Sequence, residues 1–378
     1  MISLRRTRAV AKKELLHIVR DPRSLYMALA IPMLLLILFG YALSLDVDRI
    51  PMLIYDQDKT PQSRALVARF GGSRYFEIRG HVESYRPIEL ALYRGDAMAG
   101  LVIPADFSER LLSGRQVPVQ FLLDGGDSNT AGIALGYARA MVAAYSGNIR
   151  AEWQIRQGAG EIRPPVDAQL RVMFNSKLKS RNYIVPGLIA VILMIIAALL
   201  TSLTIAREWE NGTMEELLST PLRPAELVLG KLSAFFLLGL ADMITAMLTG
   251  IWIFDVPMRG SGLLLFAGGC VFLFGGLCWG LFLSAVARNQ LLAFQMGLVS
   301  SFLPAFLLSG FVYAIDSMPL APRLLTYIVP ARYFVSLSSG IFLKGVGLEI
   351  LALELGFLFV YAGAVFFLVT RKLGAKIA

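Results

Sequence analysis

The sequence predicts an all-α, polytopic membrane protein with six transmembrane helices and a large α/β domain between the first two. Of its 378 residues, 56% are hydrophobic and only 17% are charged, and the mean hydropathy is +0.63. A soluble domain carries about 25% charged residues, so this composition indicates an integral membrane protein. The sequence also contains six apolar runs near the length of about 20 residues that a membrane helix needs.

The six predicted spans are continuous runs of mostly apolar residues. A cleaved signal peptide is the alternative for the first run, but its apolar core and the basic segment before it are both too long. We therefore expect a retained helix there. The spans are residues 25–45, 183–205, 227–254, 263–286, 291–315 and 351–370.

Both ends of the chain are rich in Lys and Arg, as the cytoplasmic flanks of membrane spans are. These flanks are the segment 1–24 and the tail 371–378, and they contribute to the net charge of +9. With six spans between them, both termini lie in the cytoplasm and residues 46–182 form an extracytoplasmic domain. Because the basic charge is explained by topology, we expect no nucleic-acid partner.

The large domain at 46–182 alternates strand-like and helix-like runs, which predicts a small α/β fold. Asp124 and Asp127 are candidates for a general acid–base pair, but Asp and Gly at this spacing are more typical of a turn. We expect no catalytic residue in this chain. The strand-like runs are 51–56, 97–104 and 117–124, and the helix-like runs are 61–70, 106–112, which begins with an Asp106 cap, and 129–157.

The segment 1–24 predicts a basic amphipathic helix, because apolar residues recur there at helical spacing among Lys and Arg. Such a helix lies in the membrane interface in contact with lipids, and a solvated cytoplasmic helix is the alternative. The residues that suggest this interfacial helix are Leu15, Ile18, Val19, Arg20 and Pro22.

The segment 316–350, between the fifth and sixth spans, is apolar but broken by prolines. We expect short re-entrant or interfacial helices at the outer face, where protein covers the irregular backbone. In the fourth span, Gly276 and Gly280 form a small-xxx-small face that permits close helix packing. That face has two possible partners, a span of the same chain or a span of a second membrane subunit.

A dense polar segment, residues 206–226, separates the second and third spans. Asn211-Gly212 is typical of the end of a helix. Thr213 is followed three residues later by Glu216, a pair that predicts a capping box and a short helix starting at the next residue. Pro221 then ends this helix, whose apolar face consists of Met214, Leu217 and Leu218. A short, rigid amphipathic helix is a common partner site, and a structured linker is the alternative.

The pattern Glu-Trp-Glu-x-Gly-Thr-Met-Glu-x-Leu-x-Ser-Thr-Pro at 208–221 resembles the signature of ATP-binding-cassette (ABC) exporter permeases of the type-2 superfamily. Other stretches that resemble this family are 13–25, 182–190, 308–319 and 329–345. The resemblance implies that the polar segment is a coupling helix held in a groove of a separate ATPase subunit. The coupling residues that the resemblance implies are Glu208, Glu210, Gly212, Thr213, Met214, Glu215, Leu217 and Pro221. The capping and apolar face of the short helix add Glu216 and Leu218 to this set.

The resemblance also implies an inner-membrane exporter built from two permease copies, identical or homologous, and two ATPase subunits. ATP and Mg²⁺ then bind the ATPase, and this chain needs no cofactor. A periplasmic adaptor is a further candidate partner of the outer domain. The few charges within the spans favour a lipophilic cargo such as a drug or a lipid.

No self-contained ATP site is predicted. Gly230-Lys231 suggests a P-loop, but Ala225 replaces the upstream glycine and Leu232 the Ser or Thr. The rival hypothesis is an ion-coupled carrier or channel, which marks its path with intramembrane charge. Only Asp242 lies clearly inside a span, so this rival is disfavoured.

Asp242 and Pro304 are the speculative residues of a substrate path. A hydrogen-bonded contact between helices is the alternative role for Asp242. No metal site is expected, because the two histidines, His17 and His81, are far apart in the sequence and Cys270 and Cys278 share one apolar run.

Overall fold

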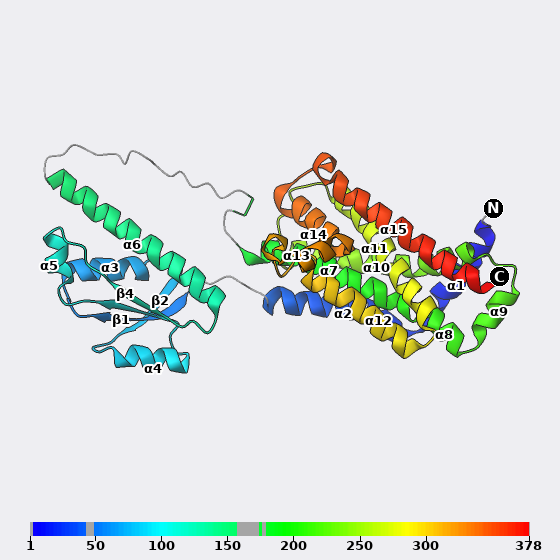
Figure 1. Cartoon of the computed structure of the whole chain (residues 1–378), viewed down its shortest axis with the longest axis horizontal. Helices are drawn as coiled ribbons and strands as arrows, with labels where there is room; N and C mark the ends of the chain where they lie inside the picture. The colour runs from blue at the N-terminus through cyan, green and yellow to red at the C-terminus, as the bar shows by residue number, and fades with distance from the viewer. Residues whose placement is uncertain (1–2, 43–48, 157–173, 176–178, 378) are drawn as a thin grey trace. The chain divides into compact units, whose positions relative to one another are not determined.

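The computed structural model describes residues 3–42, 49–156, 174–175 and 179–377, which form two compact units. The helical unit contains the chain up to residue 44 and from residue 171 onward, and the α/β unit contains residues 45–170. Each unit has its own hydrophobic core. Figure 1 shows the elements of both units.

The helical unit is built on apolar helices of membrane-spanning length. In the described part of the chain, five helical stretches are long and apolar enough to cross a bilayer, and α2 contains the shorter apolar helix Leu29–Ala42. The architecture is that of a polytopic membrane protein. The main helices are α1 (Leu4–Arg20), α2 (Pro22–Ala42), α7 (Ser180–Ser202), α8 (Thr204–Glu210), α9 (Thr213–Ser219), α10 (Pro224–Trp252), α11 (Gly262–Ala287), α12 (Gln290–Leu307) and α15 (Leu348–Ile377).

Helix α7 lies at the centre of this unit and packs against α2, α10, α11 and α12. It is apolar on all sides, as expected for a helix surrounded by other helices. A Cβ atom on Gly280 of α11 would lie 2.1 Å from the backbone oxygen of Ala198, and one on Gly276 would lie 2.9 Å from the Ala197 Cβ. The small-residue face of the fourth span therefore packs against the second span of the same chain.

The second span changes direction at Leu203, between α7 and α8. The Ser284 hydroxyl of α11 accepts hydrogen bonds from the backbone N–H groups of Ile205, at 3.0 Å, and Ala206, at 2.9 Å. It thereby satisfies two of the donors that the first turn of a helix leaves free. The buried serine thus holds α8, and the polar segment after it, to the bundle.

The fifth span is shorter than predicted, since α12 ends at Leu307 and not at residue 315. Gly310 has a left-handed φ of 84°, which a helix cannot contain. The following region forms short helices, as its prolines predict: η1 (Ile315–Ser317), α13 (Leu320–Leu325), η2 (Thr326–Ile328), α14 (Pro330–Ser339) and the π-helical turn η3 (Gly340–Lys344).

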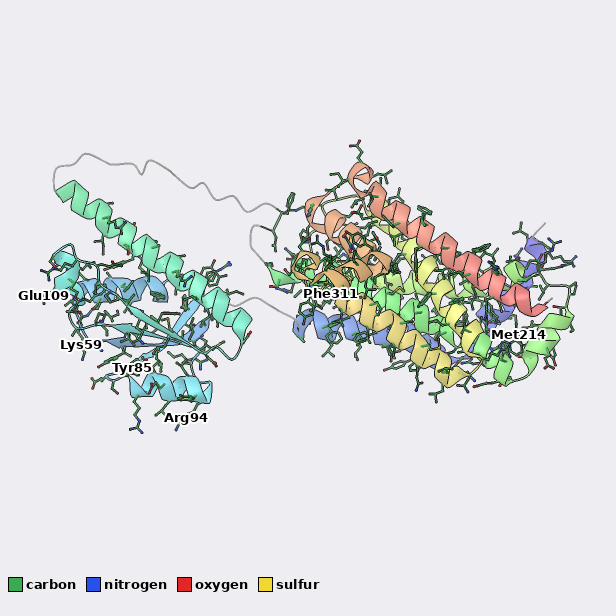
Figure 2. The ribbon with its side chains drawn as sticks, viewed as in Figure 1. Lys59, Tyr85, Arg94, Glu109, Met214 and Phe311 are labelled. Atoms are coloured by element: carbon green, nitrogen blue, oxygen red, sulfur yellow. The ribbon has the colours of Figure 1, made fainter. Side chains whose placement is uncertain are left out.

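These short helices lie at one end of the helical unit, and α1, α8 and α9 lie at the other (Figure 1). The Phe334 ring of α14 stacks on Phe272 of α11 with ring centroids 4.4 Å apart. Figure 2 shows the same separation between Phe311, near the short helices, and Met214 of α9. The short helices and the polar segment therefore lie at opposite ends of the helical unit.

The α/β unit has one four-stranded sheet in the order β2-β1-β3-β4. Strands β1, β2 and β3 are parallel and β4 is antiparallel to β3. Helices α3 and α6 cover one face and α4 lies on the other (Figure 1). The elements are β1 (Ile50–Asp56), α3 (Pro61–Gly71), β2 (Phe76–His81), α4 (Arg86–Arg94), β3 (Ala99–Ile103), α5 (Phe107–Leu112), β4 (Gln120–Leu123) and α6 (Ser128–Arg156).

Local details of this unit differ from the sequence predictions. Asp106 precedes α5 but does not cap it through its side chain, and instead its carboxylate lies 2.6 Å from the Arg110 Nε. Asp124 accepts a hydrogen bond from the backbone N–H of Gly126 at 2.8 Å, and Asp127 accepts one from that of Thr130 at 3.4 Å. Both aspartates therefore shape the turn before α6, as the simpler interpretation of their spacing predicts.

Candidate coupling site

The polar segment between the second and third spans forms two short helices joined by a left-handed glycine. Gly212 has a φ of 72°, and α9 begins directly after it. Met214 is fully buried, Leu217 is partly buried against the same core cluster, and Glu215 and Glu216 are exposed. The helix thus has one face anchored in the protein and one acidic face free.

The predicted capping box does not form. Gly212 occupies the N-cap position, so Thr213 is already the first helical residue and its hydroxyl cannot accept from the N–H of Glu216. The Thr213 Oγ1 instead donates to the backbone oxygen of Glu208 at 3.4 Å. The left-handed glycine, not the threonine, starts this helix. The Leu218 side chain lies outside the described part of the structure.

Glu208 faces the protein interior, where it joins a buried ionic cluster. Its Oε1 lies 3.1 Å from the Nζ of Lys13 in α1 and 2.8 Å from the Nζ of Lys231 in α10. The Lys231 Nζ also lies 2.8 Å from the Oε1 of Glu14 in α1. Glu14, Glu208 and Lys231 are all less than 10% exposed. The cluster thus ties α1, α8 and α10 together.

Two members of the cluster in α1 have shifted pKa values. Burial raises the pKa of Glu14, but the charge and hydrogen bond of Lys231 outweigh it, so the net pKa lies below the usual 4.5. Burial lowers the pKa of Lys13, but Glu208 and Glu14 outweigh it, so the net pKa lies above 10.5. Both groups are therefore charged at neutral pH, with formal charges that balance in the cluster.

Glu210 connects α8 to the start of α12. It accepts hydrogen bonds from the backbone N–H of Gln290, at 2.9 Å, and from the Gln290 side chain. Arg207 also reaches Gln290, with its Nε 3.4 Å from the Gln290 Oε1, and its Nη1 lies 3.3 Å from the Nε2 of His17. The Arg288 guanidinium lies 4.9 Å from the centroid of the Trp209 ring. The contacts of Glu210 and Arg207 with Gln290 therefore join the polar segment to α12.

Helix α1 packs along the polar segment and α10. Arg6 donates to the backbone oxygen of Pro221. The buried Glu226 accepts from the backbone N–H of Ser3 at 2.7 Å and of Arg223 at 3.1 Å. A Cβ atom on Gly230 would lie 2.6 Å from the Val10 Cβ, so glycine there permits the close approach of α1.

The buried face of α1 differs from the face that the sequence suggested. Val10, Glu14 and Ile18 are buried, whereas Leu15 is 39% and Val19 is 63% exposed. Arg20 is exposed, and the side chain of Pro22, which begins α2, lies outside the described part. The packed face contains the carboxylate of Glu14, and a search for apolar residues at helical spacing does not detect a buried charged residue.

Asp242 and Pro304, the predicted residues of a substrate path, do not line the cavity described for the helical unit. A cavity of about 310 Å³ lies between α1, α2, α7, α8, α10 and α12, and neither residue lines it. Asp242 is 1% exposed, and neither of its carboxylate oxygens is hydrogen-bonded within the described residues. The described residues therefore do not support the alternative role of Asp242 as a hydrogen-bonded contact between helices.

Sequence reasoning missed Lys231, which it treated only as part of a false P-loop, and Glu14. The signal was present in each case: a lysine within an apolar span requires a partner, and Glu14 lies four residues from both Val10 and Ile18. No group of three metal-binding side chains occurs among the residues that the structure describes.

Long apolar helices and a polar segment anchored by a buried ionic cluster are the features of a multi-pass membrane protein. The family model for the ABC-2 family transporter protein matches residues 22–371, and the chain belongs to this family. The family resemblance of the polar segment is thereby confirmed, and the chain is an ABC transporter permease.

Several Escherichia coli proteins are similar to it along most of their length. The probable multidrug ABC transporter permease YbhS of strain K12 is 39% identical over 97% of this chain and 96% of its own length. The probable multidrug ABC transporter permease YbhR is 30% identical over 90% of both chains. The inner membrane transport permease YhhJ is 26% identical over 88% of this chain and 90% of its own.

Proposed function

We propose that this permease is the membrane subunit of an exporter, driven by ATP hydrolysis on a separate subunit that docks on α9. The observation that carries the proposal is the two-sided build of α9, with Met214 fully buried and Glu215 and Glu216 exposed. A helix held firmly on one face transmits a force applied to the other. ATP and Mg²⁺ then belong to the docked subunit, and this chain contributes no catalytic group.

The proposed route of the movement follows the contacts of Glu208. A push on α9 reaches α8 through Gly212, and α8 is joined by Glu208 to Lys231 of α10 and, through it, to Glu14 of α1. Because buried ion pairs are costly to separate, the three helices move together. The end of the permease that α9 occupies is then the cytoplasmic end.

The remaining parts of the proposal follow from this orientation. The α/β unit is extracytoplasmic, where it is available to a periplasmic adaptor, and the protein lies in the inner membrane. Helices α12 and α15 are only 22% and 28% buried over their most apolar stretches, which suits contact with lipid and with a second permease copy. The names of YbhS and YbhR as probable multidrug permeases support a lipophilic cargo.

The test is co-purification of the permease with the ATPase subunit that the proposal requires. Glu215→Lys combined with Leu217→Asp removes an exposed acid and part of the buried anchor, so we expect little ATPase to be retained. Glu109→Lys reverses an exposed acid of the α/β unit and serves as the matched control, with full retention. Equal retention of the ATPase by both variants would refute docking on α9.

A second function, an ion-gradient-coupled carrier, is favoured only by Asp242, whose buried carboxylate oxygens accept no hydrogen bond from the described residues. Transport in membrane vesicles separates the two. Transport by an ATP-driven exporter stops without ATP and continues in the presence of an ionophore. Transport by an ion-coupled carrier continues without ATP, stops when an ionophore is added, and is lost in Asp242→Asn.

A further inference from the structure

The cavity beside the ionic cluster has an apolar wall and a polar end. Its apolar wall includes Ile31 of α2, Leu200 of α7, Phe235 of α10 and Phe294 of α12. Its polar end is formed by Glu208, Arg207 and the other members of the ionic cluster. A volume of about 310 Å³ lies within the range of small-molecule sites and exceeds what a few waters require. Such a cavity suits an amphiphile, a molecule with an apolar body and a polar head.

One atom at the polar end is left without a hydrogen-bond donor. Glu208 is 7% exposed, and its Oε1 receives both lysine ammonium groups. The Oε2 is buried and accepts no hydrogen bond from any described residue. An unpaired buried carboxylate oxygen is costly, so it calls for a donor. Since the terminal torsion of a glutamate is broad, a small rotation turns this oxygen to the cavity that Glu208 already lines.

The charges of the polar end define that donor further. Lys231 is already paired with both Glu14 and Glu208, and Lys13, whose side chain is 56% exposed, is screened by solvent. Arg207 lies at the rim of the cluster, where it suits a neighbouring anion. An ammonium group that bears N–H donors can donate a hydrogen bond to the Glu208 Oε2. A phosphate next to that ammonium group would lie near the positive charge of Arg207.

We propose that this cavity binds the primary ammonium group of an amphiphile, with Glu208 as its acceptor and the apolar wall holding its tail. This inference names a cargo class and rests on the proposed function as an exporter. Two sources share the chemistry: a lipophilic amine, or an aminophospholipid whose phosphate lies near Arg207.

The test measures binding of radiolabelled dodecylamine to the full-length permease in phosphatidylcholine nanodiscs, relative to discs without protein. Dodecyltrimethylammonium has the same tail and charge but no N–H donor, so we expect it to compete at least about tenfold more weakly. Glu208→Gln is expected to weaken dodecylamine binding about tenfold, because a hydrogen bond to a charged group is lost. Glu109→Gln removes an exposed acid of the α/β unit that does not line the cavity, so it serves as the control and is expected to bind within about threefold of wild type.

Leu200→Trp fills the apolar wall without touching the ionic cluster and is expected to abolish saturable binding, which keeps the test decisive if Glu208→Gln does not fold. Replacing phosphatidylcholine by phosphatidylethanolamine identifies the source: reduced dodecylamine binding indicates the lipid, and unchanged binding indicates a free amine. Equal competition by the trimethyl compound, unchanged binding by Leu200→Trp, or no saturable binding would overturn the proposal. Retention of the ATPase on α9 does not depend on this cavity, so the two proposals fail separately.

Discussion

Replacing Lys231 by methionine tests whether the ionic cluster holds α1, α8 and α10 together. Lys231 is 1% exposed and contacts Glu14 and Glu208 at 2.8 Å each, so its loss leaves two buried carboxylates with Lys13 alone. Breaking a buried ion pair from one side costs about 3–5 kcal/mol. Because Lys13 still lies 3.1 Å from Glu208, we expect the lower end, about 3 kcal/mol.

The assay is thermal unfolding of the purified permease in detergent. A loss of about 3 kcal/mol corresponds to a fall in Tm of about 6–12 °C on the scale of domains of 150–250 residues. Lys12→Met, an exposed residue of α1, is the matched control and should change Tm little. Adding Glu14→Gln to Lys231→Met restores charge balance, so the double variant should be more stable than Lys231→Met. Equal Tm values for Lys231→Met and Lys12→Met, or additive losses in the double variant, would refute the cluster's role.

Two further predictions concern packing and pH. Gly280→Ala places a Cβ 2.1 Å from a backbone oxygen of α7, so overpacking should cost about 1–3 kcal/mol and lower Tm, whereas Gly356→Ala, which meets nothing within 4 Å, should not. The pKa of Glu14 is depressed below 4.5 in the folded protein, so its stabilisation is present above pH 4.5 and is lost as pH falls through the folded pKa. The Tm difference between wild type and Glu14→Gln should therefore shrink below pH 4.5, and a constant difference would contradict the assignment.

The sequence was a good guide to features set by neighbouring residues. The apolar runs predicted the long helices, because a span needs about 20 apolar residues in a row. Gly212 was predicted to end a helix, and it does so with a left-handed φ of 72°. The strand-like run at 97–104 corresponds to β3, although strand β2 was not predicted.

The sequence was a poor guide where two plausible local solutions compete. A threonine followed by a glutamate three residues later favours a capping box, but Gly212 takes the N-cap position and moves the helix start by one residue. The fifth span was extended past Leu307 because the residues beyond it are apolar, and hydropathy does not register the turn that Gly310 makes.

By itself, the sequence determined the class of protein, the long apolar helices and the existence of a short polar segment between the second and third spans, since all three depend on residues close together in the chain. Only the tertiary structure decided that Glu14, Glu208 and Lys231 form one buried cluster and that Gly280 packs on α7. Glu14 and Lys231 are 217 positions apart in the chain. The partner of a buried charge is chosen by distance in space and by the cost of leaving it unpaired, and neither quantity is visible in the local pattern of residues.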